Sequence, residues 1–127
     1  MPDQSNKKVL IIDDEEDIRF LLKRAMLSRN YTVIEAANLS QAMDFYQQED
    51  PAIIIMDVNL PDGNGIYYGK KFKNDKNILI FVSADNDKLT ESFKEVGANG
   101  FLKKPFAVTQ LFDMINNAQV NATTIQQ

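Results

Sequence analysis

The 127 residues include no cysteine and no histidine. Without thiols the chain has no disulfide, no thiolate nucleophile and no thiolate metal ligand. Without imidazole it lacks the commonest general base and the commonest ligand of transition metals. Long apolar runs are missing too: none approaches the roughly 20 residues of a membrane span, and the first residues include no apolar signal-peptide core. Any chemistry must therefore rest on carboxylates, hydroxyls and lysines, and we expect a cytoplasmic protein.

Positive charge is in the minority, with 14 lysines and arginines against 18 aspartates and glutamates and a net charge of -4. This balance argues against a broad electrostatic attraction to nucleic acid or to an anionic membrane, so neither is expected as a direct partner. The length and the 44% of hydrophobic residues suit one domain with one core. We expect a disordered segment over 1–6, a domain over 7–118, and a polar tail or linker start over 119–127, where the apolar pattern fades.

Short apolar runs alternate along the chain with amphipathic stretches. The runs suit strands buried on both faces, and the stretches repeat apolar residues at the spacing of a helix. Strict alternation predicts an α/β fold, a three-layer doubly wound sandwich of five βα units around a parallel sheet. Asn38 is the predicted N-cap of the second helix, and Gly97 is predicted to close the fourth. Strands are predicted at 9–12, 31–36, 52–56, 78–82 and 100–102, and helices at 18–26, 39–46, 66–73, 89–96 and 108–115.

Polar residues stand where several of the predicted strands end. Asp13 and Asp14 follow the first strand, Asp57 the third and Ser83 the fourth, and Lys104 comes soon after the fifth. In a sheet of flavodoxin-like order 2-1-3-4-5, ligands bind at the carboxyl edge between strands one and three, where these residues would meet. Taken singly, each is more commonly a cap, a loop residue or solvated surface, so the prediction depends on their conjunction.

Carboxylates gathered at one edge repel one another by roughly 4 kcal/mol per pair at about 4 Å, for an effective dielectric constant near 20. A hard divalent cation offsets this repulsion, and Mg²⁺ prefers a few carboxylates, a carbonyl, water and phosphate oxygens. A lysine and a hydroxyl on the other side would complete a site for phosphoryl transfer to one free carboxylate. The sequence therefore predicts Mg²⁺ binding and a phosphoryl acceptor at this edge.

Five segments carry a resemblance to a known family: 11–15 (IIDDE), 55–63 (IMDVNLPDG), 82–84 (VSA), 97–98 (GA) and 101–106 (FLKKPF). Over about 7–118 the chain resembles the receiver domain of two-component response regulators, the CheY-like superfamily. The resemblance implies a signalling domain rather than an enzyme, one that catalyses only its own phosphorylation and autodephosphorylation. It makes Asp57 the phosphoacceptor, supplied by a sensor histidine kinase or a histidine phosphotransfer protein of a phosphorelay. Because this chain has no histidine, the phosphohistidine must belong to another protein.

The resemblance also implies a set of metal ligands. Asp14 and Asp57 would bind Mg²⁺ directly, with the backbone carbonyl of Asn59 as the third protein ligand. Asp13 would contribute through a water molecule. Asn59 and Asp85 would flank the path by which water attacks the aspartyl phosphate, and should therefore influence its lifetime.

Further roles follow from the same resemblance. Lys104 is the phosphate-binding lysine, whereas Lys103 points away because neighbouring residues of a strand face opposite sides. The bond between Lys104 and Pro105 is expected to be cis, a geometry almost confined to X-Pro bonds. The hydroxyl of Ser83 would donate to the new phosphoryl oxygens, and the small Ala84 leaves room for them.

Phe101 occupies the position of the switch aromatic in the same resemblance. A phosphoryl group adds about -1.5 to -2 charges and would draw Ser83 and Lys104 inward, so that Phe101 can change rotamer. The face made by 89–96, 100–102 and 108–115 would then shift between two states, for a downstream protein to read or for a dimer to form. Plain core packing is the alternative for Phe101, and the sequence does not say whether an output domain is fused.

Three other functions remain alternatives at this stage. A haloacid-dehalogenase-type phosphatase needs a second acid two residues after the nucleophile, and Asn59 stands there. A flavodoxin needs a glycine- and hydroxyl-rich phosphate-binding loop after the first strand. Here that place is taken by the acidic residues 13–16, which would repel a phosphate. A receiver-like module that is not phosphorylated usually lacks one pocket residue, and none is lacking here.

One residue departs from the family pattern. Gly69 stands in the third predicted helix where an aliphatic residue is common, and it costs roughly 0.5 to 1 kcal/mol relative to alanine. Either this helix is short or Phe72 fills the space.

Overall fold

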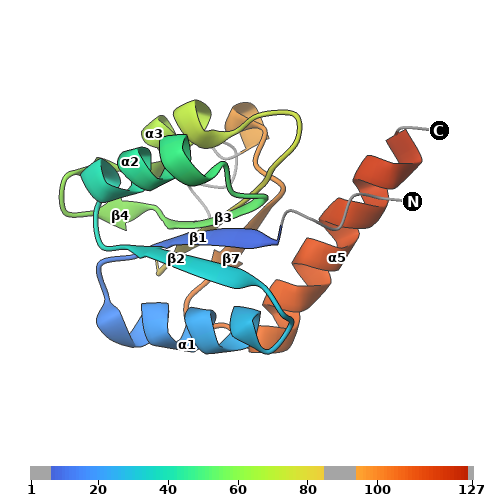
Figure 1. Ribbon diagram of the computed structural model, residues 1–127, viewed down its shortest axis with the longest axis horizontal. Helices are drawn as coiled ribbons and strands as arrows, with labels where there is room; N and C mark the ends of the chain where they lie inside the picture. Colours follow the sequence, from blue (N-terminus) through green and yellow to red (C-terminus); the bar gives the residue numbers. More distant parts are fainter. Residues whose placement is uncertain (1–6, 85–93, 126–127) are drawn as a thin grey trace.

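The computed structural model describes residues 7–84 and 94–125. Five parallel strands form a sheet of order β2-β1-β3-β6-β7, flanked by helices on both faces (Figure 1). Numbered within this sheet alone, the order is 2-1-3-4-5, so the predicted doubly wound α/β fold is confirmed. The strands are β1 (Lys8–Ile12), β2 (Thr32–Ala36), β3 (Ile53–Asp57), β6 (Ile78–Ser83) and β7 (Gly100–Lys103), and the helices are α1 (Glu16–Leu27), α2 (Leu39–Glu49), α3 (Gly65–Phe72) and α5 (Val108–Ile125).

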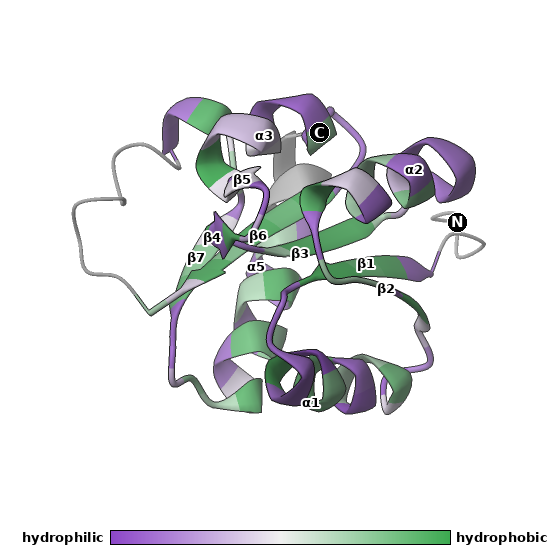
Figure 2. Ribbon diagram, turned by 90° about the vertical axis from the view of Figure 1, so that its left-hand side faces the viewer, coloured by the Kyte–Doolittle hydropathy of each residue, from purple (hydrophilic) through white to green (hydrophobic). Residues whose placement is uncertain are grey.

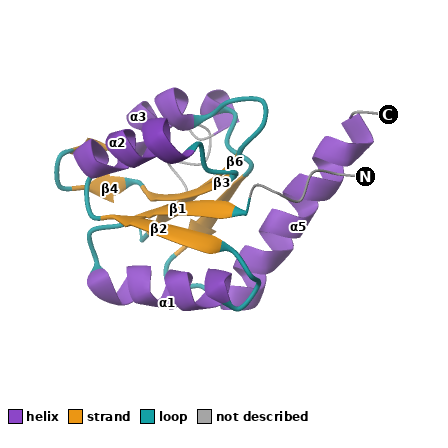
Figure 3. Cartoon of the chain, in the orientation of Figure 1, coloured by secondary structure: helices purple, strands orange, loops and turns teal. Residues whose placement is uncertain are grey.

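The sheet separates two hydrophobic clusters. Successive side chains of a strand point to opposite faces, and here both faces are covered. Leu10 of β1 packs in the cluster with α2 and α3, and its neighbour Ile11 packs in the cluster with α1 and α5. Figure 3 shows the same layers, with α2 and α3 above the sheet and α1 below it. The central strands β1, β3 and β6 are mostly hydrophobic (Figure 2), as suits strands buried from both sides.

A small hairpin after β3 was not predicted. β4 (Asn59–Leu60) pairs antiparallel with β5 (Gly63–Asn64), and Pro61 and Asp62 form its tip. Its strands are too short to show any alternation of apolar residues, so the sequence reveals the turn and not the pairing. The hairpin leads directly into α3, whose first amides are capped by the Asn64 side chain.

The helix ends follow the expected signals, with one exception. Asn38 caps α2 by accepting from the Gln41 amide, and Gly97 has a positive φ of 85° after the helical residues 94–96. The last helix is predicted at 108–115, with a polar tail from 119, but α5 continues to Ile125, because 108–125 contain no proline or glycine to stop propagation. Within 7–84 and 94–125, no helix combines the length and apolar character needed to cross a bilayer. The segments 1–6 and 89–93, of which predictions were made, lie outside the described residues.

Close packing against the sheet explains why residue 69 is glycine. A Cβ at Gly69 would lie 2.5 Å from Cζ of Phe81 and 3.3 Å from Cγ1 of Val96. Helix α3 is indeed short, at 8 residues, but the ring that fills the space beside it is Phe81 of β6 and not Phe72, as the sequence suggested. The glycine lets α3 approach the sheet closely.

We expect Gly69→Ala to lower the free energy of unfolding by about 1 kcal/mol. Overpacking against the buried Phe81 ring costs about 1–3 kcal/mol, and the better helix propensity of alanine recovers less than that. Urea denaturation measures the difference, and Lys70→Ala, an exposed change in the same helix, should stay within about 0.5 kcal/mol of the parent. A Gly69→Ala protein more stable than the parent would show that the Phe81 ring moves aside without loss of packing energy.

Candidate functional site

The polar residues singled out in the sequence meet at the carboxyl edge of the sheet. Asp13 follows β1 directly, Asp57 ends β3 and Ser83 ends β6. The strands are in register, with Ile12 beside Met56 and Ser83 beside Lys103, so their ends come level. The sheet itself therefore gathers side chains that are far apart in the sequence.

Three carboxylates form a cluster at this edge. Oxygen atoms of Asp13, Asp14 and Asp57 all lie within 4.8 Å of one another. Asp13 and Asp57 are buried, whereas Asp14 is exposed. The backbone amide of Asn59 donates to Oδ1 of Asp57 over 3.1 Å, which ties the start of the hairpin to the central carboxylate.

One ammonium group faces this cluster. Nζ of Lys104 lies 3.0 Å from Oδ2 of Asp13 and 3.3 Å from Oδ2 of Asp57. It also pairs with Glu15 at 3.3 Å, a residue of the acidic motif to which the sequence alone assigned no role. Lys103 is exposed, and the peptide bond between Lys104 and Pro105 is cis, as the resemblance implies. The structure thus brings Lys104, and not its neighbour, to the carboxylates.

The charges at the site do not balance. Burial, and then the negative charge of Asp13, raise the pKa of Asp57 to about 6, although the Asn59 amide and Lys104 oppose this. Burial also raises the pKa of Asp13. Burial alone would lower the pKa of Lys104, but its contacts with Asp13 and Asp57 outweigh this and raise it. Among the residues that the structure describes, one cation faces a cluster of carboxylates, which leaves negative charge uncompensated.

The cluster fits a divalent metal ion. Oδ2 of Asp13 is buried and has the ion pair with Lys104, but it accepts no hydrogen bond within the described part of the chain. An all-oxygen donor set of this kind suits a hard cation such as Mg²⁺. Asp13, Asp14 and Asp57 could hold such an ion, and its charge would offset their repulsion.

The remaining predicted residues surround the same edge or lie further out. Ser83 is fully buried, Ala84 is exposed, and Asn59 is exposed at the start of the hairpin. Phe101 is half-buried and packs against the cluster shared with α2 and α3. Asp85 lies outside the described residues.

Comparison with known proteins places the chain in a family. The family model for the response regulator receiver domain matches residues 9–116. The chain belongs to this family. The receiver domain is the signal-accepting part of two-component response regulators, so a signalling role follows from the match.

Similar proteins differ in their length. The receiver domain is 34% identical over 114 residues to sporulation initiation phosphotransferase F of Bacillus subtilis (strain 168), covering 87% of this chain and 91% of that protein. It is 33% identical over 120 residues to the alkaline phosphatase synthesis transcriptional regulatory protein PhoP of the same organism, covering 92% of this chain but 48% of that protein. The chain therefore spans nearly all of one relative and about half of the other.

A solved structure supports the fold. The crystal structure of a CheY-like response regulator receiver domain protein from Methanospirillum hungatei JF-1 superposes with a TM-score of 0.85. The sequences are 22% identical, and the match covers 94% of this chain and 98% of that one. At this identity the likeness speaks for the fold alone.

Sequence reasoning missed a close backbone contact in the receiver domain. The Gly65 amide donates to the carbonyl oxygen of Val58 over 2.7 Å, and a Cβ at Gly65 would overlap the carbonyl oxygen of Asp57. The turn residues 61–65 indicate a change of direction, but nothing in them reveals which backbone lies against it. A residue larger than glycine would push the start of α3 away from the end of β3.

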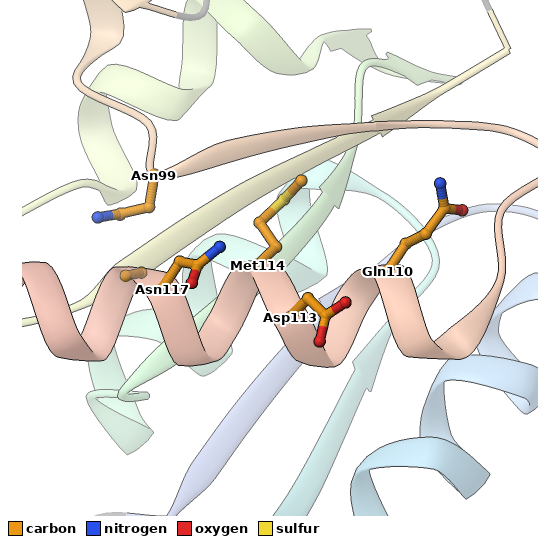
Figure 4. Close-up of a pocket in the computed structure, with 6 residues that line it drawn as sticks. Asn99, Gln110, Asp113, Met114 and Asn117 are labelled. Atoms are coloured by element: carbon orange, nitrogen blue, oxygen red, sulfur yellow. The ribbon is translucent and has the colours of Figure 1, made fainter.

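A separate cavity of the receiver domain lies along α5, between that helix and the residue before β7 (Figure 4). Its volume is about 420 Å³, and Met114 extends from α5 toward β7 between polar neighbours. No predicted metal or phosphoryl-site residue lines it, so the acidic site is a different place on the domain. The lining residues are Asn99, Gln110, Asp113, Met114, Asn117 and Ala118.

Proposed function

We propose that Asp57 accepts a phosphoryl group from a phosphohistidine of a sensor histidine kinase or a histidine phosphotransfer protein. The observation that carries this proposal is the position of Asp57 at the end of β3, buried between other carboxylates and the ammonium of Lys104. These 127 residues contain no histidine, so the donor lies outside them. Family membership makes a partner of this kind the natural source.

The transfer exchanges one bond for another. A carboxylate oxygen of Asp57 attacks the phosphorus, an O–P bond forms, and the P–N bond breaks with its electron pair left on the imidazole nitrogen. With a pKa of about 6, Asp57 is mostly ionised at neutral pH and available as the nucleophile. Bound Mg²⁺ would supply positive charge to the phosphoryl oxygens, held by Asp14, Asp57, the Asn59 carbonyl and, through water, Asp13.

Two side chains then respond to the phosphoryl group. Lys104 exchanges its carboxylate contacts for the more highly charged phosphoryl oxygens, and the buried Ser83 hydroxyl donates to one of them. The half-buried Phe101 follows by changing rotamer, which biases the surface of β7 and α5 toward one of two states. A downstream protein, or a second copy forming a dimer, reads this surface.

The relatives suggest two arrangements of the full protein, a stand-alone receiver or a receiver joined to an output domain. The chain spans 91% of the phosphotransferase relative, which fits a stand-alone receiver that passes phosphoryl groups on or contacts proteins directly. It spans 48% of the transcriptional relative, which fits a receiver joined to an output domain. In either arrangement we place the protein in the cytoplasm, where the kinase domains that supply phosphohistidine work, and the length of the full gene decides between the two.

Acetyl phosphate with Mg²⁺ tests the proposal. We expect intact-mass spectrometry to show one added phosphoryl group on the parent protein and none on Asp57→Ala. Asp113→Asn, which removes an exposed carboxylate on α5, should be modified like the parent. An unmodified parent protein, or equal modification of Asp57→Ala, would contradict the assignment of Asp57.

A further inference from the structure

We infer that Asp62 is a positioning residue for the metal ligand Asn59, because its carboxylate fastens the tip of the β4–β5 hairpin to the first turn of α2. The inference rests on the proposed function, in which the Asn59 carbonyl binds Mg²⁺. Asp62 itself does not belong to the carboxylate cluster at the edge of the sheet. It would act through the backbone of the hairpin.

The contacts of Asp62 reach far along the sequence. Its Oδ1 accepts from the Leu39 amide over 2.8 Å, across 23 residues, and its Oδ2 accepts from the Ser40 amide over 3.1 Å. The first amides of a helix have no partners within the helix, and the positive end of the helix dipole attracts a carboxylate. The hydrogen bond that the Leu39 amide donates accordingly lowers the pKa of Asp62.

Helix α2 has a local cap of its own in addition to Asp62. The Asn38 side chain accepts from the Gln41 amide over 2.9 Å, and the Gln41 side chain accepts from the Ala37 amide over 2.9 Å. This reciprocal pair is local, within 4 residues, and satisfies the Gln41 and Ala37 amides, whereas Asp62 takes the Leu39 and Ser40 amides. The two bonds of Asp62 are therefore additional, and what they fix is the hairpin.

The hairpin holds Asn59 between two anchors. At its base, the Asn59 amide donates to Asp57 and the Gly65 amide donates to Val58. At its tip, Asp62 stands next to the paired residues Leu60 and Gly63. If the tip is released, the base alone sets the direction of the Asn59 carbonyl, while the buried Leu60 still secures the fold.

The decisive comparison is between Asp62→Ala and Asn38→Ala. Both remove capping from the same helix end, so both should lower the thermal midpoint to a similar degree. Isothermal titration calorimetry should show Mg²⁺ binding weakened about tenfold in Asp62→Ala and less than about twofold in Asn38→Ala, since partners that orient a ligand typically change metal affinity by 10–100-fold. Equal losses in both variants would overturn the inference, because helix stability alone would then explain them.

Asp62→Asn separates geometry from charge. Asparagine keeps a side-chain acceptor for the Leu39 amide but removes the negative charge. We expect its Mg²⁺ affinity to stay within about threefold of the parent, because asparagine caps helices as well as aspartate does. A loss as large as that of Asp62→Ala would mean that only the charge matters, and would overturn the positioning role.

Amide hydrogen exchange of the metal-free proteins tests the tether without Mg²⁺. The Asn59 amide should exchange about fivefold faster in Asp62→Ala than in the parent, and at the parent rate in Asn38→Ala, because only the first opens the hairpin locally. Unchanged exchange in Asp62→Ala would refute the tether. A parent protein that fails to bind Mg²⁺ would contradict the proposed function instead, and the exchange result would still decide the role of Asp62.

Discussion

Lys104→Ala is expected to lower the free energy of unfolding of the metal-free protein by about 3 kcal/mol. The Lys104 ammonium lies 3.0 Å from Asp13 and 3.3 Å from Asp57, whose carboxylates are both buried. Its removal leaves like charges facing each other without a cation, and breaking a buried pair costs more than the pair contributes. A loss of this size equals that expected for truncating a large side chain in the core.

Urea denaturation in the presence of a chelator measures this loss. Lys103→Ala is the matched control, since it removes the neighbouring, exposed ammonium and should change stability by less than about 0.5 kcal/mol. Excess Mg²⁺ should stabilise Lys104→Ala more than the parent, because the ion replaces the missing positive charge. If both lysine variants lose the same free energy of unfolding, the ion pairs of Lys104 do not stabilise the protein more than an exposed lysine does.

Stability of the metal-free parent should fall as pH rises from about 4 to about 6, by up to about 3 kcal/mol. The pKa of Asp57 rises from 3.8 to about 6 on folding, so between these values the folded state binds more protons than the unfolded state. The free energy of unfolding then decreases with pH until Asp57 is ionised. Asp13, whose pKa is also raised, acts in the same direction, whereas Lys104 keeps its proton throughout this range.

Asp57→Asn isolates the contribution of that one carboxylate. At pH 7 the variant should be more stable than the parent by about 2 kcal/mol, and the difference should disappear near pH 4, where the parent carboxyl is protonated in the folded protein. Chelator is needed in both samples, because bound Mg²⁺ would favour the ionised carboxylate. A variant that is less stable than the parent at pH 7, or a difference independent of pH, would contradict the raised pKa.

The sheet and its acidic edge could be predicted because their signals are local. The three central strands β1, β3 and β6 are short apolar runs rich in β-branched residues and buried on both faces, and Asp13, Asp57 and Ser83 stand directly where they end. A parallel sheet then brings these ends together without further information. The order of the strands is confirmed, and so is the signalling family to which the resemblance pointed.

Contacts between distant segments could not be predicted. The hydrogen bonds of Asp62 to α2 and the close approach of Gly65 to the end of β3 join residues with no shared local pattern. The sequence suggests Phe72, three positions along the same helix, as the ring beside Gly69, whereas Phe81 arrives from β6. Sequence periodicity shows which face of an element is apolar, but not which side chain it meets.

The division of the interior into two clusters bears on how such a chain can change over generations. Leu10 and Phe72 pack on one side of the sheet and Ile11 and Leu111 on the other, and residues without common partners affect stability nearly independently. The helices on one face can accumulate substitutions without requiring compensation on the other. The carboxyl edge is different: β1 and β3 supply residues to both clusters and lead into the carboxylates of Asp13 and Asp57, so substitutions on either face can affect this site.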